Sequence, residues 1–320
     1  MVYMLFDNPA DKKNMDFLKD YETCSIKQIY PEHKCNSTKE MIKVCRDCLK
    51  QSQNGDIIIC WYDFMAVLLW WICKFQRKYR KIIVLNILLK DKNTVKNRIA
   101  KFLYKPVLKS KQVKATVTSQ NYGKYLNQVL KIQKKYILLH DIYHENYKIE
   151  CDKKEIDNSV FCGGRNGRDW DFLLKVAKEM PDVTFNCVMP KDKYEQYKQA
   201  LSKNINVEFD ITEQEFLEVM YQSKLIVTPL ETEAPAGLIV FFQAGANRKM
   251  IITSDTVTTQ EYFAEERGVL CGKSIEMWKK KIYYYLRHEE EAEKCARKFE
   301  QFLNDNCSEE NYAKIISSMI

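Results

Sequence analysis

The 320-residue chain has no long apolar run: the longest unbroken one, residues 64–73, is too short to span a bilayer. Its start, MVYMLFDNPADKKN, has no basic region ahead of a long apolar stretch, so we expect no secretory signal. There is no low-complexity tail, and 46% apolar residues are typical of a globular protein rather than a disordered one. We therefore expect a protein that folds throughout and is cytoplasmic.

The sequence also lacks a disulfide or zinc pattern. Its twelve cysteines are scattered over a chain without an export signal, which favours free, buried thiols. Cys45 and Cys48 form the only C-x-x-C, and no second pair completes a zinc set. Both fall on the apolar face of a helix that begins after a Ser37 to Glu40 capping box, so we interpret them as core residues.

Acidic residues are nearly missing from one segment. Residues 74–114 contain fourteen Lys or Arg and one acid, Asp91, whereas the whole chain has a net charge of +8. This basic tract indicates an anionic partner: nucleic acid, a membrane surface or a phosphorylated acceptor. Within it, a predicted helix over 93–104 combines apolar and basic residues until Pro106 stops it, which is typical of a membrane-surface helix or of a solvated surface helix.

Exposed aromatic rings among the charges, which binding to single-stranded nucleic acid would need, are few. Trp70, Trp71 and Phe75 precede the basic helix at a spacing that favours the core. We therefore expect no nucleic-acid partner. A nucleic-acid-binding protein remains the alternative that the charge alone supports, and it predicts steeply salt-dependent binding.

The first half alternates short apolar strands, such as VYMLF, DIIIC and KIIVLNILL, with helical patterns. This order predicts a parallel sheet with right-handed crossovers. No G-x-G-x-x-G follows the first strand, so nothing indicates a dinucleotide site there. The second half repeats the alternation, and the aperiodic segment 136–157 separates the two. We predict an α/β protein with two Rossmann-like domains, at 1–150 and 151–320, and a last helix that packs back on the first domain.

Two loops of the second half carry the candidate site. One follows the strand SVFCGG and contains Gly164, Arg165 and Arg168. Because arginine forks two hydrogen bonds onto phosphate oxygens, this loop is a plausible holder for a diphosphate. The other follows the strand KLIVTPL, carries Glu233 and ends at Gly237, where a helix starts and its unpaired N–H groups attract anions.

The helix that follows Arg168 starts with two acids that we do not interpret as a metal site. Asp169 and Asp171 form a D-x-D, but both fall in the first turn of the helix, where its dipole favours carboxylates. We expect no metal and no cofactor.

Four segments of the second half resemble the donor-binding half of family four (group one) glycosyltransferases of the GT-B fold: NSVFCGGRNGRDWDFLLKVAKEMPDVTF, NVEFDITEQEFLEVMYQSKLIVTPL, APAGLIVFFQAGANRKMIITS and VLCGKSIEMWKKKIYYYL. The resemblance covers about half the chain. It implies two Rossmann-like domains facing across a cleft, the first of which holds the acceptor and the second a nucleotide-sugar donor.

The resemblance also implies roles for individual residues. The family's Gly-Arg and Lys, which hold the donor diphosphate, correspond to Gly164 and Arg165, and to Arg168 in place of the lysine. The first glutamate of the family's E-x7-E pair corresponds to Glu233, near the sugar hydroxyls and Gly237. The second corresponds to Gln243, two residues further along than in the family, which puts the ribose contact in doubt.

By this resemblance the function is transfer of a sugar from a nucleotide-sugar donor to a glycan or lipid-phosphate-linked acceptor, as in polysaccharide biosynthesis. The reaction would be retaining and metal-independent, with Glu233, Arg165 and Arg168 as catalytic residues. The basic tract would place the protein peripherally at the inner face of an anionic membrane. Two alternatives stay open: a degenerate nucleotide-sugar-binding partner protein, which Gln243 favours, and a sugar-nucleotide epimerase of the same fold.

Overall fold

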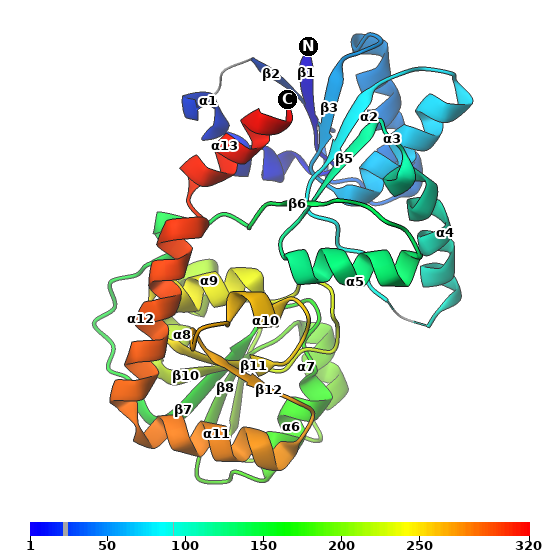
Figure 1. Ribbon diagram of the computed structural model, residues 1–320. Coiled ribbons are helices and arrows are strands. Elements are labelled where there is room, and N and C mark those ends of the chain that lie inside the picture. Colours follow the sequence, from blue (N-terminus) through cyan, green and yellow to red (C-terminus); the bar gives the residue numbers. More distant parts are fainter. Residues whose placement is uncertain (22–24, 92) are drawn as a thin grey trace. The chain divides into compact units, whose positions relative to one another are not determined.

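The computed structural model describes residues 1–21, 25–91 and 93–320, which form two compact units, each with its own six-stranded parallel sheet (Figure 1). The first unit comprises Met1–Ile142 and Glu309–Ile320, and the second comprises Tyr143–Ser308. The predicted α/β class and the two Rossmann-like domains are confirmed.

The division between the units differs from the expected boundary at residue 150. Tyr147 is buried in the core of the second unit, so the segment before residue 150 belongs there. Tyr312 and Ile316 are buried in the core of the first unit, which therefore includes the last helix. The chain passes between the units twice because its end returns to the unit in which it began.

In the first unit, β1 lies inside the sheet, between β2 and β3, and the sheet order is β2-β1-β3-β4-β5-β6. The strands are β1 (Val2–Leu5), β2 (Ile26–Ile29), β3 (Ile57–Cys60), β4 (Lys81–Val84), β5 (Val113–Val117) and β6 (Ile137–Leu138). The helices are η1 (Pro9–Met15, a 3-10 helix), α1 (Leu18–Tyr21), α2 (Thr38–Gln51), α3 (Asp63–Phe75), α4 (Val95–Lys109), α5 (Gln120–Leu130) and α13 (Glu309–Met319).

Helices cover the sheet of the first unit on both faces. Helix α13 packs with η1 and α1 against strand residues such as Met4 and Ile83. Helices α2 and α3 contact β1, β3 and β4, and α4 packs on α3 and β5. The predicted Ser37 cap is present, since its hydroxyl accepts a hydrogen bond from the N–H of Glu40 at 3.3 Å.

Two expectations for the basic tract are wrong. Helix α4 does not stop at Pro106 but continues through it to Lys109, because Val107 and Leu108 are buried against the unit and hold the last turn in place. Phe75 is not a core residue: it is the last residue of α3 and is 79% exposed, whereas Trp70 is buried.

In the second unit, β7 and β10 are neighbours at the centre of the sheet, whose order is β12-β11-β10-β7-β8-β9. The strands are β7 (Ile156–Gly163), β8 (Thr184–Val188), β9 (Ile205–Glu208), β10 (Ser223–Thr228), β11 (Met250–Ser254) and β12 (Val269–Cys271). The helices are η2 (Glu145–Tyr147, a 3-10 helix), α6 (Trp170–Lys178), α7 (Lys191–Tyr197), α8 (Glu213–Gln222), α9 (Leu238–Ala246), α10 (Thr259–Tyr262), α11 (Ile275–Arg287) and α12 (Glu289–Asn306).

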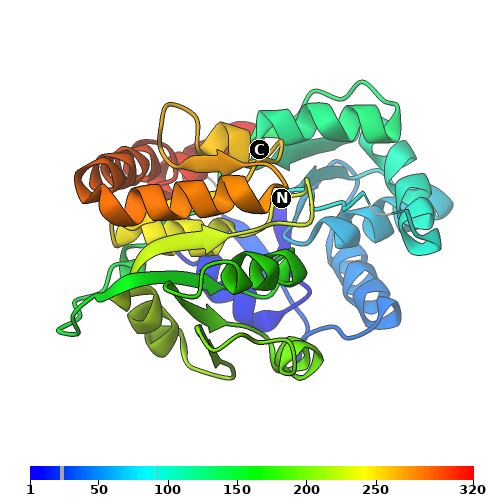
Figure 2. The same cartoon turned by 90° about the horizontal axis from the view of Figure 1, so that it is seen from below.

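Both faces of this sheet are buried, as the continuous apolar strands predict. Val160 and Cys162 pack in one cluster with residues of α6 and α11, and Phe161, between them in the strand, packs in a second cluster with α8 and α9. Helix α12 contributes to both clusters. Figures 1 and 2 show the resulting layers of helix, sheet and helix.

In the described part of the chain, no helix has the length and apolar character needed to cross a membrane. The eleven described cysteines all carry free thiols, and ten of them are buried, as predicted; Cys24 lies outside the described residues.

Candidate functional site

The site predicted from the two loops lies where the second sheet changes direction. From β7 the chain moves to β8 and β9 on one side, and it then crosses to β10 on the other side of β7. The connections that leave β7 and β10 therefore diverge at the carboxyl edge of the sheet. Ligands bind to open α/β sheets at such switch points.

The loops that follow β7 and β10 are joined by backbone hydrogen bonds. The N–H of Glu231 donates to the carbonyl of Gly167, and the N–H of Asp169 donates to that of Pro229, both at 3.0 Å. Arg168 and Leu230 also form an isolated antiparallel bridge. Gly164 to Asp169 and Pro229 to Gly237 are thus one structural feature, although they are more than fifty residues apart in the sequence.

The side chain of Arg168 is buried where these two loops meet and is only 7% exposed. Its Nε donates to the carbonyl of Gly163 at 2.7 Å, and its Nη1 donates to that of Asn166 at 3.0 Å. Burial lowers the pKa of the guanidinium, but an arginine stays charged. Arg168 therefore brings a positive charge to the loops while it fixes their backbone.

Gly164 and Gly237 both lie against the Arg168 guanidinium. A methyl group on Gly164 would be 2.5 Å from Nη2, and one on Gly237 would be 3.2 Å from Nη1. Both glycines also have a positive φ, +115° and +84°. The structure thus brings together three of the predicted residues, and only glycine allows this approach without strain.

Helix α9 starts at this point, as predicted, with Gly237 as its N-cap. The N–H of Phe241 donates to the carbonyl of Gly237, so the N–H groups of the preceding turn have no partner within the helix. The start of α9 therefore directs N–H groups toward the switch point, where they favour an anion.

Arg165 directly follows Gly164 in the chain, and its side chain is exposed. With Gly164 it lines a pocket of about 570 Å³ at the carboxyl ends of β7, β8 and β9. The rest of the lining comes from the ends of β8 and β9 and from the segments that lead into α7 and α8: Val188, Met189, Pro190, Lys191, Asp192, Lys193, Asp210, Ile211 and Phe216. In the described part of the chain no carboxylate pairs with Arg165, so its donors are available to a ligand.

The sequence interpretation did not include the two lysines of this pocket. Lys191 and Lys193 follow the strand VTFNCVM and stand at the first turn of α7. A strand followed by Pro190 and two lysines at a helix start is a detectable signal for an anion site. Opposite them, Ile211 and Phe216 provide an apolar wall, so the pocket offers both cations and a hydrophobic surface.

Glu233 is held by the connection after β11. Its Oε2 accepts a hydrogen bond from the N–H of Val257 at 2.8 Å, and its carbonyl accepts one from Oγ1 of Thr258 at 3.0 Å. The carboxylate thus has a fixed position at the carboxyl edge of the sheet, four residues before Gly237.

Gln243 lies inside α9 and is 4% exposed. Its Nε2 donates to Oε1 of Glu213 in the first turn of α8, at 3.4 Å. The side-chain amide of Gln243 is uncharged and already has a hydrogen-bond partner in Glu213. The other predicted site residues lie in the loops after β7 and β10. The contact of Gln243 with a ribose stays a prediction.

The acids of the D-x-D have other partners. Asp169 is the N-cap of α6, and its Oδ1 accepts a hydrogen bond from the N–H of Phe172 at 3.1 Å. Asp171 forms an ion pair with Lys175 at 3.2 Å. Among the described residues, no group of three or more His, Cys, Asp or Glu is placed to hold a metal ion.

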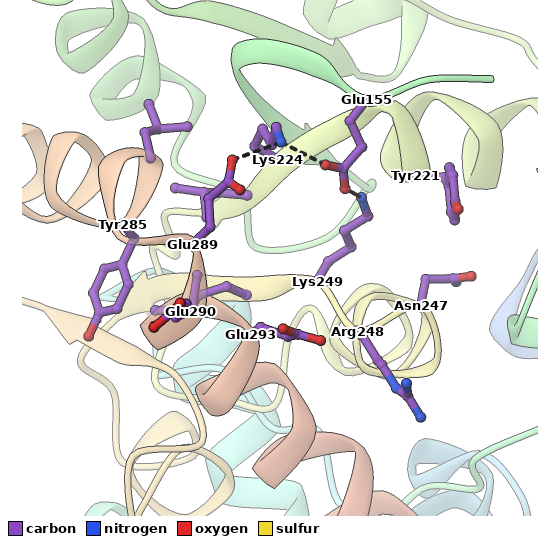
Figure 3. A pocket seen from close by; sticks show the side chains of 14 residues that line it. Glu155, Tyr221, Lys224, Asn247, Arg248, Lys249, Tyr285, Glu289, Glu290 and Glu293 are labelled. Atoms are coloured by element: carbon purple, nitrogen blue, oxygen red, sulfur yellow. Dashed lines mark hydrogen bonds and ion pairs between the residues drawn. The ribbon is translucent and has the colours of Figure 1, made fainter.

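A second pocket of about 410 Å³ lies at the opposite, amino edge of the same sheet (Figure 3). Its lysines are already paired: Lys224 bonds to Glu289 and Glu155 at 2.9 Å, and the buried Lys249 bonds to Glu155. The hydrogen bonds from Glu289 and Glu155 raise the pKa of Lys224, whereas burial lowers that of Lys249. Since Glu290 and Glu293 also line it, this pocket does not favour an anion.

Comparisons with known proteins relate the chain to one family model and to several solved structures. Residues 165–317 match a family model described as glycosyl transferase-like. HepE from Anabaena, solved in complex with UDP and glucose, has a TM-score of 0.73 at 11% identity, and the match covers 100% of this chain and 99% of that one. The chain has the GT-B fold.

Two further solved structures extend the comparison. Sucrose-phosphate synthase from Thermosynechococcus elongatus has a TM-score of 0.78 at 11% identity, with coverage of 100% of this chain and 98% of that one. The lipopolysaccharide outer core galactosyltransferase WaaB has a TM-score of 0.65 at 10% identity, with 100% and 99% coverage. No curated protein matches the sequence. The fold that the resemblance to group-one glycosyltransferases implies is therefore confirmed.

Proposed function

We propose that the protein is a glycosyltransferase that binds a nucleotide-sugar donor at the carboxyl edge of its second sheet and transfers the sugar to an acceptor. The observation that carries the proposal is that Gly164 and Gly237, the latter at the start of α9, meet at the buried Arg168 guanidinium, and that the exposed Arg165 directly follows Gly164. This arrangement concentrates positive charge and N–H donors at one point, which suits a diphosphate.

The pocket beside Arg165 is the proposed place for the nucleoside. Its apolar wall, Ile211 and Phe216, suits the face of a base, and Lys191 and Lys193 add positive charge around the phosphates. Because HepE was solved with UDP and glucose, a uridine diphosphate sugar is the first donor that we propose to test.

The chemistry that we propose requires stabilisation of the leaving diphosphate. Arg165 and the N–H groups at the start of α9 would stabilise the charge that develops there, with Arg168 as a second cation below them. Glu233, fixed by Val257, would orient the sugar hydroxyls. We propose a retaining transfer without a metal, because these cations are available to the phosphates and the D-x-D acids have other partners.

For the acceptor we propose a glycan or a lipid-phosphate-linked glycan. The basic tract of residues 74–114 in the first unit supports an anionic acceptor or an anionic surface that presents it. We propose a peripheral contact of this tract with an anionic membrane.

One observation favours a second candidate, a degenerate protein that binds nucleotide sugars without turnover. Gln243 replaces the acid that the resemblance implies, and its amide is buried against Glu213. The two candidates separate in one experiment, in which donor binding is measured by calorimetry and donor consumption is followed by release of the nucleoside diphosphate.

The test of the enzyme uses UDP-glucose and related donors with the parent protein and the Glu233→Gln variant. We expect the parent to release UDP in the presence of acceptor, and the variant to bind the donor but release UDP at least tenfold more slowly. Release that is unchanged in the variant would contradict the role of Glu233. Binding without release in the parent, with every donor and acceptor tried, would favour the degenerate protein.

A further inference from the structure

Helix α4 of the first unit has apolar side chains on its exposed face. Val95, Ile99 and Phe102 are 66%, 55% and 72% exposed. They follow one another at spacings of four and three residues, so they lie on one side of the helix. Tyr104, Val107 and Leu108 are buried on the other side. The helix therefore packs on its unit through one apolar face and presents a second one to the surroundings.

Phe75, the exposed last residue of α3, extends this surface. Its ring stacks on that of Trp71, with centroids 5.7 Å apart, and Nε1 of Trp71 donates to the carbonyl of Leu103 on α4 at 3.3 Å. We name Phe75, Val95, Ile99 and Phe102 together the α3–α4 patch. Rings and aliphatic side chains of this size rarely gather on a surface without a partner.

Basic residues surround the α3–α4 patch. Lys96, Arg98 and Lys105 stand beside it on α4, and Lys74 and Arg77 stand beside Phe75. In the described part of the chain no carboxylate pairs with any of these five, whereas Lys101 is paired with Asp91. Arg80, another cation of the basic tract, is buried and does not contribute to this surface.

Arg80 is buried and serves the fold of the first unit. Its Nε donates to Oγ of Ser52 at 2.9 Å, and its Nη1 donates to Oδ1 of Asn54 at 2.7 Å. The accessible charge of the basic tract is therefore concentrated on α4 and at the end of α3, around the apolar side chains.

We propose that the α3–α4 patch docks on an anionic lipid bilayer, with Ile99 and Phe102 among the lipid headgroups and Lys96, Arg98 and Lys105 on the phosphates. A bilayer interface accepts aliphatic and aromatic side chains and cations on one surface, which is the combination found here. A nucleic acid would use the cations and Phe75, but it offers no apolar environment for Val95 and Ile99. The proposal rests on the peripheral membrane contact of the proposed function and gives it a surface; it does not depend on the donor site of the second unit, so the two can fail separately.

The test is co-sedimentation of the full chain with two kinds of vesicle, phosphatidylcholine alone and phosphatidylcholine mixed with phosphatidylglycerol. We expect binding to the mixed vesicles that weakens as salt is added, and little binding to the neutral ones. Replacing Ile99 and Phe102 with serine together should weaken binding at least tenfold. Each of Lys96→Gln, Arg98→Gln and Lys105→Gln should weaken it about fivefold.

Matched controls use an exposed apolar residue and an exposed lysine on another helix. Met277→Ser and Lys280→Gln on α11 change the same types of side chain outside the α3–α4 patch, and we expect vesicle binding as in the parent. Melting temperatures should be unchanged in all variants, because the replaced side chains are exposed.

Several results would overturn the proposal. These are equal binding to neutral and anionic vesicles, binding to neither, or binding that the α4 variants do not change. Salt-dependent binding to an oligonucleotide without vesicle binding would assign the surface to nucleic acid. Loss of self-association in the Ile99 and Phe102 variant, again without vesicle binding in the parent, would assign it to a second copy of the chain.

Discussion

Two arginines three residues apart have different environments. Arg165 is exposed and lines the pocket, whereas Arg168 is buried and bonds to the carbonyls of Gly163 and Asn166. The sequence suggested one role for both, the holding of a diphosphate. The structure gives Arg168 a second role, because it fixes the loops that present Arg165.

Arg165→Ala should weaken binding of UDP at least tenfold. A charge-assisted hydrogen bond contributes roughly 1.5 to 3 kcal/mol, and the lower bound corresponds to a little more than tenfold in dissociation constant. The melting temperature should not change, since the side chain is exposed. Calorimetry with UDP and a thermal scan are the two measurements.

Two other variants serve as controls for this prediction. Asp171→Asn should bind UDP as the parent does, because Asp171 pairs with Lys175 on the surface of α6. Arg168→Ala should lower the melting temperature, because it leaves buried carbonyls without donors. Parent-like affinity in Arg165→Ala, or UDP binding that a chelator abolishes, would contradict the proposed donor site.

Asp141 is a residue of the first unit whose protonation changes near neutral pH. Burial raises its pKa to about 6, although the hydrogen bond from Nδ2 of Asn86 to Oδ1, at 3.0 Å, opposes the rise. Between about pH 4 and pH 6 the folded state holds this proton more tightly than the unfolded state does. The contribution of Asp141 to stability therefore falls as the pH rises through that window, and the destabilisation is complete above it.

Asp141→Asn should consequently stabilise the protein above pH 6 and have little effect at pH 4. The gain is at most about 3 kcal/mol, and we expect less because the residue is not fully enclosed. The Asn86 amide can still donate to the new side chain. Unfolding by urea at pH 4 and pH 7.5, with the parent measured in parallel, gives the difference. A difference that is equal at both pH values would contradict a raised pKa.

At the scale of the element, α13 completes the first unit from the far end of the chain. Tyr312, Ala313, Ile316 and Met319 are buried in the cluster around Met4 and Phe6, and Nζ of Lys114 donates to the carbonyl of Met319 at 2.7 Å. The apolar side of the helix thus takes part in the core of a unit whose other elements end at residue 142.

Ile316→Ala should lower the unfolding free energy of the first unit by about 2 to 5 kcal/mol, the usual range for a buried isoleucine. The second unit should unfold as before. Hydrogen exchange followed by mass spectrometry reports the two units separately. Lys314→Ala, at an exposed position of the same helix, should stay within about 0.5 kcal/mol of the parent. An equal effect of Ile316→Ala on both units would contradict this assignment of α13.

At the scale of the whole molecule, the division of the chain predicts which fragments fold. Residues 143–308 contain a complete sheet with both faces covered, and the segment before β7 belongs to it. Nδ2 of Asn247 donates to the carbonyl of Tyr147 at 2.7 Å, and Oδ1 of Asn247 accepts from the N–H of Ile149 at 3.1 Å.

The fragment 143–308 should therefore unfold in one cooperative transition. The fragment 151–320, cut at the boundary that the sequence suggested, should be less stable and should associate. It lacks Tyr147 and exposes the apolar side of α13. Circular dichroism during heating and analytical ultracentrifugation compare the two. Equal stability and a monomeric state for both fragments would contradict the division after Ile142.

Local patterns in the sequence determined a large part of this protein. Alternating apolar strands and amphipathic helices predicted two parallel sheets, because the periodicity of burial is a property of neighbouring residues. Ser37 predicted the cap that starts α2, and its hydrogen bond from the N–H of Glu40 is present, because a cap involves only residues of one turn. Gly237 likewise predicted the start of α9.

Tertiary structure alone decided what depends on residues far apart in the chain. It gave Arg165 and Arg168 different roles, because Arg168 is buried where the loop after β7 meets the loop after β10, whereas Arg165 stays exposed. It also carried α4 past Pro106, because Val107 and Leu108 are buried there. The spacing of Phe75 favoured the core, yet its side chain is exposed, as is that of Phe102. An apolar residue at helical spacing fits a core or a surface until its neighbours in the fold are known.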